Sequence, residues 1–406
     1  MAGLVGIVNM FFHLVPWILI LLWSAGTALA NELASPRFRP VDIDSHIEIG
    51  YGIALTDVDG DQRPDILVAD RKQIAWYRNP RWEKFVIAEN LTSLDNVCLA
   101  AADVDGDGKA EIAAGAGWNP SDTTNSGAVF YLVAPPDRTK KWDPVALPHE
   151  PTVHRMRWIR NTAGQFELVV VPLHGRGNQG TTGTGVRILA YHRPVDSRAA
   201  WQTELIDGSL HATHNFDVIK WTEHPGDELL VAAKEGVFHF VKHGTAWQPS
   251  QLPGVATGGV QPGAGEVRGG KLAEGGKFVA TIEPMHGNQL VVYTETKGSG
   301  ASWRRHVLDD ALQEGHALAC GDLLHAGFDQ VVVGWRGKNR EGKVGIKMFW
   351  PRDAEGNNWD QVNVDDNTVA CEDLRLGDLN ADGRIDVVAA GRATRNLMVF
   401  FNEPRK

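Results

Sequence analysis

An acidic nine-residue pattern occurs three times in this chain. The first copy begins at Asp57 and reads Asp-Val-Asp-Gly-Asp-Gln-Arg-Pro-Asp, and the later copies begin at Asp103 and Asp378. Each copy lies between short apolar runs, which is typical of a tight loop joining two β-strands. A loop that recurs in the same strand context predicts a fold built from repeated β units.

Side chains that offer oxygen ligands stand at the first, third, fifth and ninth positions of every copy. They are Asp57, Asp59, Asp61 and Asp65; Asp103, Asp105, Asp107 and Glu111; and Asp378, Asn380, Asp382 and Asp386. Such a set can converge on one hard cation, and calcium suits it best. A solvated acidic turn without an ion is the alternative. The spacing favours calcium because it is kept in all three copies.

A second marker is an aromatic residue followed by a short alternating strand. It occurs at Trp82, Trp142, Trp201, Trp247, Trp303 and Trp359, with a weaker version at Phe38. The six Trp markers lie 46 to 60 residues apart, a spacing that suits one four-stranded propeller blade each. Large aromatics at fixed repeat positions are expected to pack between blades.

These markers predict an all-β fold, a seven-bladed β-propeller forming a single domain over residues 31–406. The Phe38 strand has no unit before it, and the last unit ends at Phe401 without a marked strand of its own. Pairing the N-terminal strand with the last blade would close the ring and remove its open edges.

Residues 1–30 contain no Lys, Arg, Asp or Glu, and an apolar run from Phe11 to Trp23 precedes Ala28-Leu29-Ala30. We interpret this segment as a signal peptide cut after Ala30, which predicts an exported protein in the periplasm or outside the cell. An uncleaved membrane anchor is the alternative, since the segment is near spanning length. No membrane contact is expected after cleavage.

The charge and cysteine content exclude several classes of protein. The net charge of −10 argues against nucleic-acid and anionic-membrane partners, which select basic surfaces. Three cysteines cannot pair completely, so a disulfide-stapled scaffold is excluded. The sequence leaves the oligomeric state open.

Aligning the repeats on their acidic loops compares the starts of the innermost strands. The aligned positions hold Tyr51, Val97, His154, His214, Glu266, His316 and Glu372. Three histidines and two glutamates around one mouth of the channel form a candidate site for zinc or another divalent metal. A hydrogen-bonded channel lining without metal is the alternative, and His211 could take the place of His214.

Loops between the second and third strands of each blade should emerge at the same mouth. The residues there that suit a hydroxylated ligand are Trp118, Arg176, Trp335, Arg336 and Arg392. An indole offers a stacking face and a guanidinium offers a hydrogen-bonding fork, so we predict that these residues bind substrate. A solvated polar rim is the alternative.

The acidic loops resemble those of FG-GAP and VCBS-type repeat propellers, whose Asp-rich loops bind calcium. The segments His211-Ala-Thr-His214-Asn-Phe, Glu283-Pro-Met-His286-Gly-Asn and Glu314-Gly-His316-Ala-Leu resemble the propeller part of the aldos-2-ulose dehydratase family. That resemblance implies a metal-containing lyase acting on keto sugars such as 1,5-anhydrofructose. The family also has a cupin-like part, and we expect no counterpart of it within residues 31–406, which the predicted propeller occupies.

The chemistry implied is a dehydratase-type β-elimination next to a carbonyl. A channel metal held by the histidines would polarise the carbonyl oxygen, and a base would remove the activated proton. His286 and His174 are the candidates for the catalytic base, with Tyr51 as a third.

Two other functions remain open. A propeller polysaccharide lyase would use the same elimination on uronate polymers, with Arg176, Arg336 or Arg392 neutralising the carboxylate. A non-catalytic carbohydrate-binding or adhesion propeller would need the calcium loops but not the histidines. The histidines at aligned strand starts favour an enzyme.

Overall fold

The computed structural model describes residues 1, 3, 36–257, 262–296 and 302–404. Within these residues, 28 β-strands form seven antiparallel sheets of four strands, and one short 3₁₀ helix, η1 (Ala273–Gly275), lies between two strands. The predicted signal segment lies outside the described residues. No helix in the described part of the chain is long and apolar enough to cross a membrane.

Each sheet is one blade, and six blades use four consecutive strands. In chain order these are β2 (Gly52–Thr56), β3 (Asp65–Ala69), β4 (Gln73–Arg78) and β5 (Glu83–Glu89); β6 (Cys98–Ala102), β7 (Glu111–Ala116), β8 (Ala128–Val133) and β9 (Asp143–Leu147); β10 (Val153–Arg160), β11 (Phe166–Pro172), β12 (Ile188–His192) and β13 (Gln202–Asp207); β14 (Thr213–Ile219), β15 (Glu228–Ala233), β16 (Gly236–His243) and β17 (Ala246–Gln251); β18 (Glu266–Lys271), β19 (Lys277–Glu283), β20 (Gln289–Glu295) and β21 (Trp303–Asp309); and β22 (Gly315–Gly321), β23 (Gln330–Trp335), β24 (Gly345–Pro351) and β25 (Trp359–Asp366).

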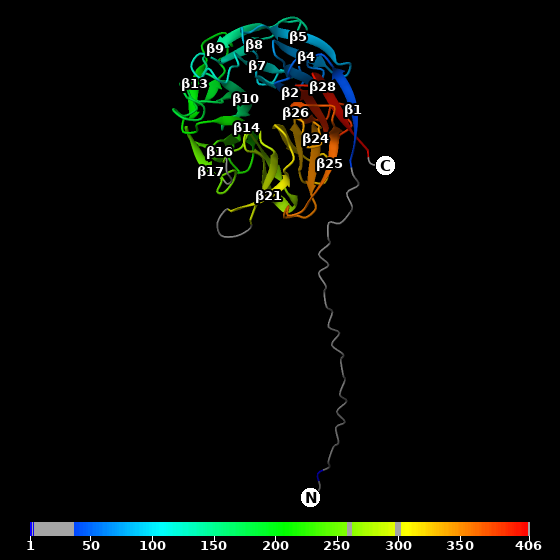
Figure 1. Ribbon diagram of the computed structural model, residues 1–406. Coiled ribbons are helices and arrows are strands. Elements are labelled where there is room, and N and C mark those ends of the chain that lie inside the picture. The colour runs from blue at the N-terminus through cyan, green and yellow to red at the C-terminus, as the bar shows by residue number, and fades with distance from the viewer. Residues whose placement is uncertain (2, 4–35, 258–261, 297–301, 405–406) are drawn as a thin grey trace. The chain divides into compact units, whose positions relative to one another are not determined.

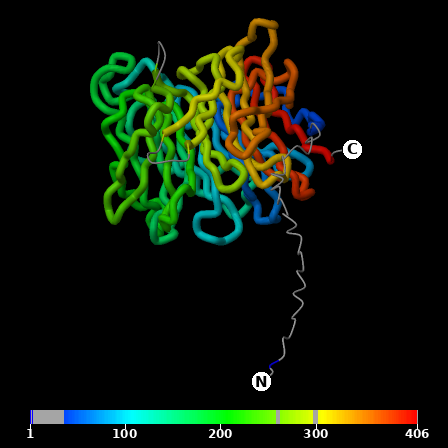
Figure 2. Tube along the Cα trace, turned by 90° about the horizontal axis from the view of Figure 1, so that it is seen from below, coloured from blue at the N-terminus to red at the C-terminus, as the bar shows by residue number. Residues whose placement is uncertain are grey.

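The seventh blade joins the two ends of the propeller. It contains β26 (Cys371–Gly377), β27 (Asp386–Gly391), β28 (Asn396–Glu403) and, at its outer edge, β1 (Arg37–Asp44). In the antiparallel β1–β28 ladder Phe38 lies opposite Asn402 and Val41 opposite Val399. Figure 2 shows the first strand beside the last strands. The predicted ring closure is confirmed.

The innermost strands of the seven blades surround a central channel. They contact one another in turn, from β2 through β6, β10, β14, β18 and β22 to β26, and β26 contacts β2 again (Figure 1). The prediction of an all-β, seven-bladed propeller is therefore confirmed.

The hydrophobic core lies between neighbouring blades. The second strand of a blade is covered on both faces, so β3, β7, β23 and β27 are buried along their whole length. Trp201 packs across such an interface, with its ring centroid 5.2 Å from that of Tyr131 and 6.4 Å from that of Trp158. This marker fills space between blades, as expected from the repeat.

The acidic loops join the first and second strands of their blades, at the end of the channel opposite the innermost strand starts. In the last of these loops the buried Asp386 carboxylate accepts hydrogen bonds from the backbone N–H of Leu379 at 3.0 Å and of Asn402 at 2.9 Å. Asp65 binds the N–H groups of Val58 and Asn79 in the same way. The ninth position thus links the loop to the end of the third strand of its blade, at Asn79 after β4 and at Asn402 in β28.

We expect replacement of Asp386 by Ala to lower the free energy of unfolding by about 2–4 kcal/mol, because two buried N–H groups lose their acceptor. Urea unfolding followed by circular dichroism in calcium-free buffer measures the change. Asp310→Ala, at an exposed position, is the control and should change stability by less than about 0.5 kcal/mol. Equal stability of the two variants would show that the carboxylate does not support the loop.

Candidate functional site

Four innermost strands begin with a β-bulge. The pairing register shifts by one residue near the start of β10, β14, β22 and β26. The extra residues are His154, His214, His316 and Glu372. A bulge takes one residue out of the ladder and redirects its side chain, and bulges are common next to active sites. The aligned polar positions found in the sequence are therefore the positions that leave the regular strand.

The Nδ1 atom of each bulged histidine is hydrogen-bonded to a backbone carbonyl of the next blade. Nδ1 of His154 donates to the carbonyl oxygen of His214 at 2.7 Å, and Nδ1 of His214 donates to that of Gly265 at 2.8 Å. Nδ1 of His316 donates to the carbonyl of Glu372 at 2.6 Å. Because a carbonyl oxygen only accepts, these contacts place the proton on Nδ1 and leave a lone pair on every Nε2.

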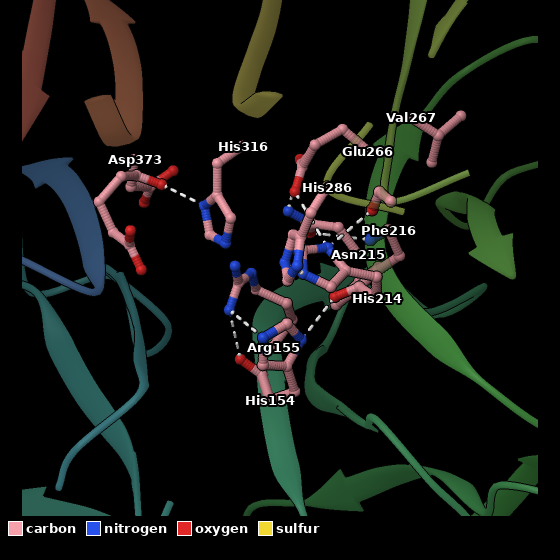
Figure 3. A network of polar contacts seen from close by, with 12 residues as sticks. His154, Arg155, His214, Asn215, Phe216, Glu266, Val267, His286, His316 and Asp373 are labelled. Atoms are coloured by element: carbon pink, nitrogen blue, oxygen red, sulfur yellow. Dashed lines mark hydrogen bonds and ion pairs between the residues drawn. The ribbon is translucent and has the colours of Figure 1, made fainter. Parts of the chain in front are cut away.

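Two bulged histidines and one loop histidine come together at the channel mouth. His286 lies in the β19–β20 loop, and its Nε2 is 2.7 Å from Nε2 of His214. Its ring stacks on that of His316, with centroids 4.9 Å apart. One nitrogen from each of the three residues lies within 4.8 Å of the other two (Figure 3). We refer to His214, His286 and His316 as the histidine triad.

The surroundings of the triad disfavour protonated rings. His286 keeps an exposed surface at the channel mouth, and partial burial of its ring, followed by the charges of His214 and Arg336, lowers its pKa to about 2. Burial also lowers the pKa of His214, and burial together with Arg336 holds the pKa of His316 well below its usual value. Neutral imidazoles with fixed second nitrogens are what zinc and similar divalent ions require of histidine ligands. The donor set therefore fits such a cation.

His154 stands beside the triad rather than in it. Its ring centroid lies 4.5 Å from that of His214, and its other face stacks on Trp118 at 4.8 Å. Nε2 of His154 accepts a hydrogen bond from Nη1 of Arg155 at 3.0 Å (Figure 3). Burial and the positive charge of Arg155 keep the pKa of His154 well below its usual value. A neutral imidazole thus faces the site without belonging to the group of three.

The two glutamates predicted as metal ligands are instead held by other side chains. Glu266 accepts from Nδ2 of Asn215 at 2.7 Å and lies 3.3 Å from a guanidinium nitrogen of Arg268. Although burial raises its pKa, the hydrogen bond from His214 and the charge of Arg268 lower the pKa of Glu266 to about 2. This ionised carboxylate also lies 3.3 Å from Nδ1 of His214, so it supports the triad from behind.

Glu372 is the centre of an arginine cluster at the rim. It accepts from Nη1 of Arg336 at 2.7 Å and from Nη1 of Arg392 at 2.9 Å. Arg176, on another loop, donates to the Glu150 carboxylate at 3.2 Å. All three arginines predicted to bind substrate therefore already pair with a carboxylate of the chain.

The remaining predicted residues lie in different surroundings. The hydroxyl of Tyr51 donates to Asp95 at 3.1 Å, and burial together with that carboxylate raises the pKa of Tyr51 to about 12. His174 lies outside the triad, and burial lowers its pKa. Trp335 is only 4% exposed and packs in the core, where its indole N–H binds the carbonyl of Lys343. Trp118 lies at the site, where its ring stacks on that of His154.

Sequence reasoning did not select Arg155 or Asn215. Each follows a bulged histidine directly, and the comparison of blades used only the aligned position itself. The sequence did contain a signal for these two residues, namely two polar residues in succession at the start of a strand. In a regular strand the second of them would enter the apolar interface between blades.

Two acidic loops gather carboxylates tightly enough to hold a cation. The groups are Asp57, Asp59 and Asp61, and Asp103, Asp105 and Glu111. Burial and the charges of Asp61 and Asp57 raise the pKa of Asp59. One buried oxygen of Asp59 has no hydrogen-bond partner among the described residues. A bound cation would relieve both the repulsion and the missing contact.

Comparison with known proteins first defines the class of the molecule. Residues 57–114 match the FG-GAP-like repeat and residues 99–132 the FG-GAP repeat. Similar solved folds include a chain of the crystal structure of BBS1N in complex with ARL6DN, with a TM-score of 0.54, 13% identity and 91% and 97% of the two chains covered. A chain of the mitotic checkpoint complex has a TM-score of 0.55, 14% identity and 98% and 99% coverage. At these identities the likeness shows the fold alone.

This chain is therefore a seven-bladed β-propeller with segments that match FG-GAP repeats. Residues 126–296 match the family described as aldos-2-ulose dehydratase, beta-propeller domain. Aldos-2-ulose dehydratase from Phanerodontia chrysosporium is 27% identical over 238 residues, which cover 52% of this chain and 26% of the relative. The chain thus matches about a quarter of that enzyme's length. The range matched by the family model, residues 126–296, contains His154, His214 and His286, whereas His316 lies beyond it.

For the triad, we expect the purified protein to retain about one zinc ion per chain after zinc loading and desalting. His286→Ala should weaken zinc binding by about a hundredfold or more, because one of three nitrogen ligands is lost. Elemental analysis and zinc titration measure the effect. His46→Ala, at an exposed turn, is the control, and equal zinc retention by the two variants would exclude the triad as the site.

For the acidic loops, we expect calcium to raise the thermal midpoint and Asp59→Asn to reduce that rise. In EDTA the same variant should be at least as stable as the wild type, because carboxylate repulsion is relieved. Thermal unfolding with and without calcium distinguishes the two effects. Asp310→Asn, at an exposed position, should leave the calcium response unchanged, and an unchanged response in Asp59→Asn would remove this loop as a calcium site.

Proposed function

We propose that this chain is a metal-dependent carbon–oxygen lyase that dehydrates a keto sugar at the mouth of its central channel. The observation that supports this most directly is the histidine triad beside a separate, neutral His154. Similarity to a sugar dehydratase gives independent support, at 27% identity over part of that enzyme.

Zinc or another divalent ion would be held by His214, His286 and His316. When bound, it would supply Lewis acidity to polarise the carbonyl group of the sugar. The chain's contribution is to keep the three imidazoles neutral and aimed inward. Hydrogen bonds from Nδ1 to carbonyl oxygens fix His214 and His316, and burial lowers the pKa of both rings, which disfavours their protonation. No further ligand from Glu266 or Glu372 is needed.

His154 is our candidate for the catalytic base, in place of His286 or His174. Its Nδ1 is occupied by the His214 carbonyl, so its Nε2 is the atom that can accept a proton. In the elimination, Nε2 takes the proton from the carbon next to the carbonyl, the C–H electrons form a double bond, and the hydroxyl on the following carbon departs. The imidazolium that results faces the same site and can return its proton, so that the products are an enone and water.

Two side chains position this base. Trp118 stacks on the imidazole and limits its rotation, and Arg155 holds Nε2 by a hydrogen bond that the substrate must replace. The positive charge of Arg155 disfavours a protonated His154 in the resting site, which keeps the base ready to accept a proton.

The arrangement of the rim arginines favours a neutral keto sugar over a uronate polymer. Arg336 pairs with Glu314 and Glu372, Arg392 pairs with Glu372, and Arg176 shares Glu150 with Arg187, so a substrate carboxylate would have to compete with a carboxylate of the chain. This competition disfavours the polysaccharide lyase among the alternatives. A binding propeller without catalysis would leave the three convergent histidines without a use.

The zinc-loaded protein should convert 1,5-anhydrofructose or an aldos-2-ulose into an unsaturated ketone, detected by its ultraviolet absorbance. His154→Gln should lower kcat by about 10²- to 10⁴-fold while zinc content stays unchanged, since the glutamine cannot carry the proton. Loss of zinc in this variant would make His154 a ligand, and retention of full activity would place the base elsewhere. Product from uronate polymers but not from keto sugars would support the polysaccharide lyase instead.

A further inference from the structure

A second polar site lies deeper in the channel, beyond the histidines. A cavity of about 390 Å³ is lined by all seven innermost strands. Its residues come from the middle and the far ends of these strands, so it lies toward the acidic-loop mouth. Because a strand rises about 3.3 Å per residue, a wall residue three positions past a bulged histidine lies about 10 Å from it along the strand.

This layer of the channel combines small and charged side chains. Three positions after the aligned strand starts stand Ala54, Ala100, Arg157, Asp217, Gly269, Ala319 and Arg375, and Arg268 adjoins Gly269. The small side chains leave the cavity open, and the charged side chains contribute to its wall. Apart from Asp217, every charged side chain of the wall is an arginine.

Two of the arginines have carboxylate partners outside the wall. Arg268 lies 3.3 Å from Glu266, and Arg375 donates to Asp373 at 2.7 Å. Each also donates to the carbonyl of its preceding residue. A guanidinium has five N–H donors, so both cavity-lining arginines keep donors beyond those used in these contacts.

Arg157 differs because no described carboxylate lies within ion-pair distance of it. Its side chain packs over Phe216, with the guanidinium carbon 5.1 Å from the ring centroid, and its hydrogen bond to Asn215 Oδ1 is 3.3 Å long. Burial and the charges of Arg375 and Arg268 lower its pKa, which is the mark of a cation in need of a negative partner. Asp217 is the nearest acid on the wall, and one of its oxygens binds the N–H of Gly269 at 3.0 Å.

We propose that this cavity is a binding site for a small oxyanion, whose carboxylate, phosphate or sulfate group is held by Arg157, Arg268 and Arg375. Guanidinium groups match such planar or tetrahedral anions by paired hydrogen bonds. The apolar part of the wall, including Met156 and Leu318, leaves room for a short carbon skeleton. The free carboxylate oxygen of Asp217 suits a hydroxyl donor on the same ligand.

The proposed anion site shares no side chain with the histidines of the proposed lyase reaction. Arg268 is linked to the triad through Glu266, and Arg157 through Asn215. Anion binding is therefore measured directly and not through activity.

Titration calorimetry of the full chain with sulfate, phosphate and succinate tests the proposal at constant ionic strength. We expect saturable binding of at least one of these anions, and a loss of affinity of tenfold or more in Arg157→Gln. Arg81→Gln, at an exposed turn with no described side-chain contact, should bind as the wild type does. A preference for succinate would indicate an organic acid, and a preference for phosphate or sulfate a tetrahedral anion.

Thermal unfolding provides a second measurement. Sulfate and phosphate stabilise most proteins by exclusion from the surface, so only a saturable rise that Arg157→Gln loses supports the site. If Arg157→Gln does not fold, Arg375→Gln takes its place. Absence of saturable binding by all three anions, or equal binding by the wild type and a folded arginine variant, would overturn the proposal.

Discussion

Ring closure is the constraint on which the rest of this structure depends. Pairing of β1 with β28 fixes the first and last blades to each other, so seven sheets must share one axis. Every innermost strand then faces six others across a narrow channel. Side chains from residues as distant in sequence as Tyr51 and Glu372 are brought to one mouth only because the ring is closed.

Bulges convert this symmetric scaffold into an asymmetric site. A regular strand would place its side chains alternately in the two blade interfaces, where polar groups are costly. The extra residue in β10, β14, β22 and β26 leaves the ladder of backbone hydrogen bonds. Each bulged histidine then donates from a ring nitrogen to a neighbouring blade, and Glu372 accepts such a bond at its backbone carbonyl. The pairing of β18 with β19 has no bulge, and His286, which this blade contributes to the triad, comes from the β19–β20 loop instead.

The channel is electrostatically divided along its length. Neutral imidazoles occupy one mouth, with Glu266 and Glu372 behind them and arginines paired to both. Arginines and small residues line the deeper cavity, and acidic loops surround the far mouth. Each layer therefore suits a different kind of ligand. The triad suits one cation, the arginines suit an anion, and the acidic loops suit a second kind of cation.

The sequence by itself determined the fold, because both repeat markers, the acidic loop and the Trp-marked strand, are local patterns with a fixed spacing. It also located His154, His214 and His316, since strand starts can be aligned from one blade to the next. Only the tertiary structure decided which histidines meet. His286 reaches His214 across 72 residues, and Glu372 is taken by Arg336 and Arg392. Such pairings depend on distances between blades, which a repeat pattern does not encode.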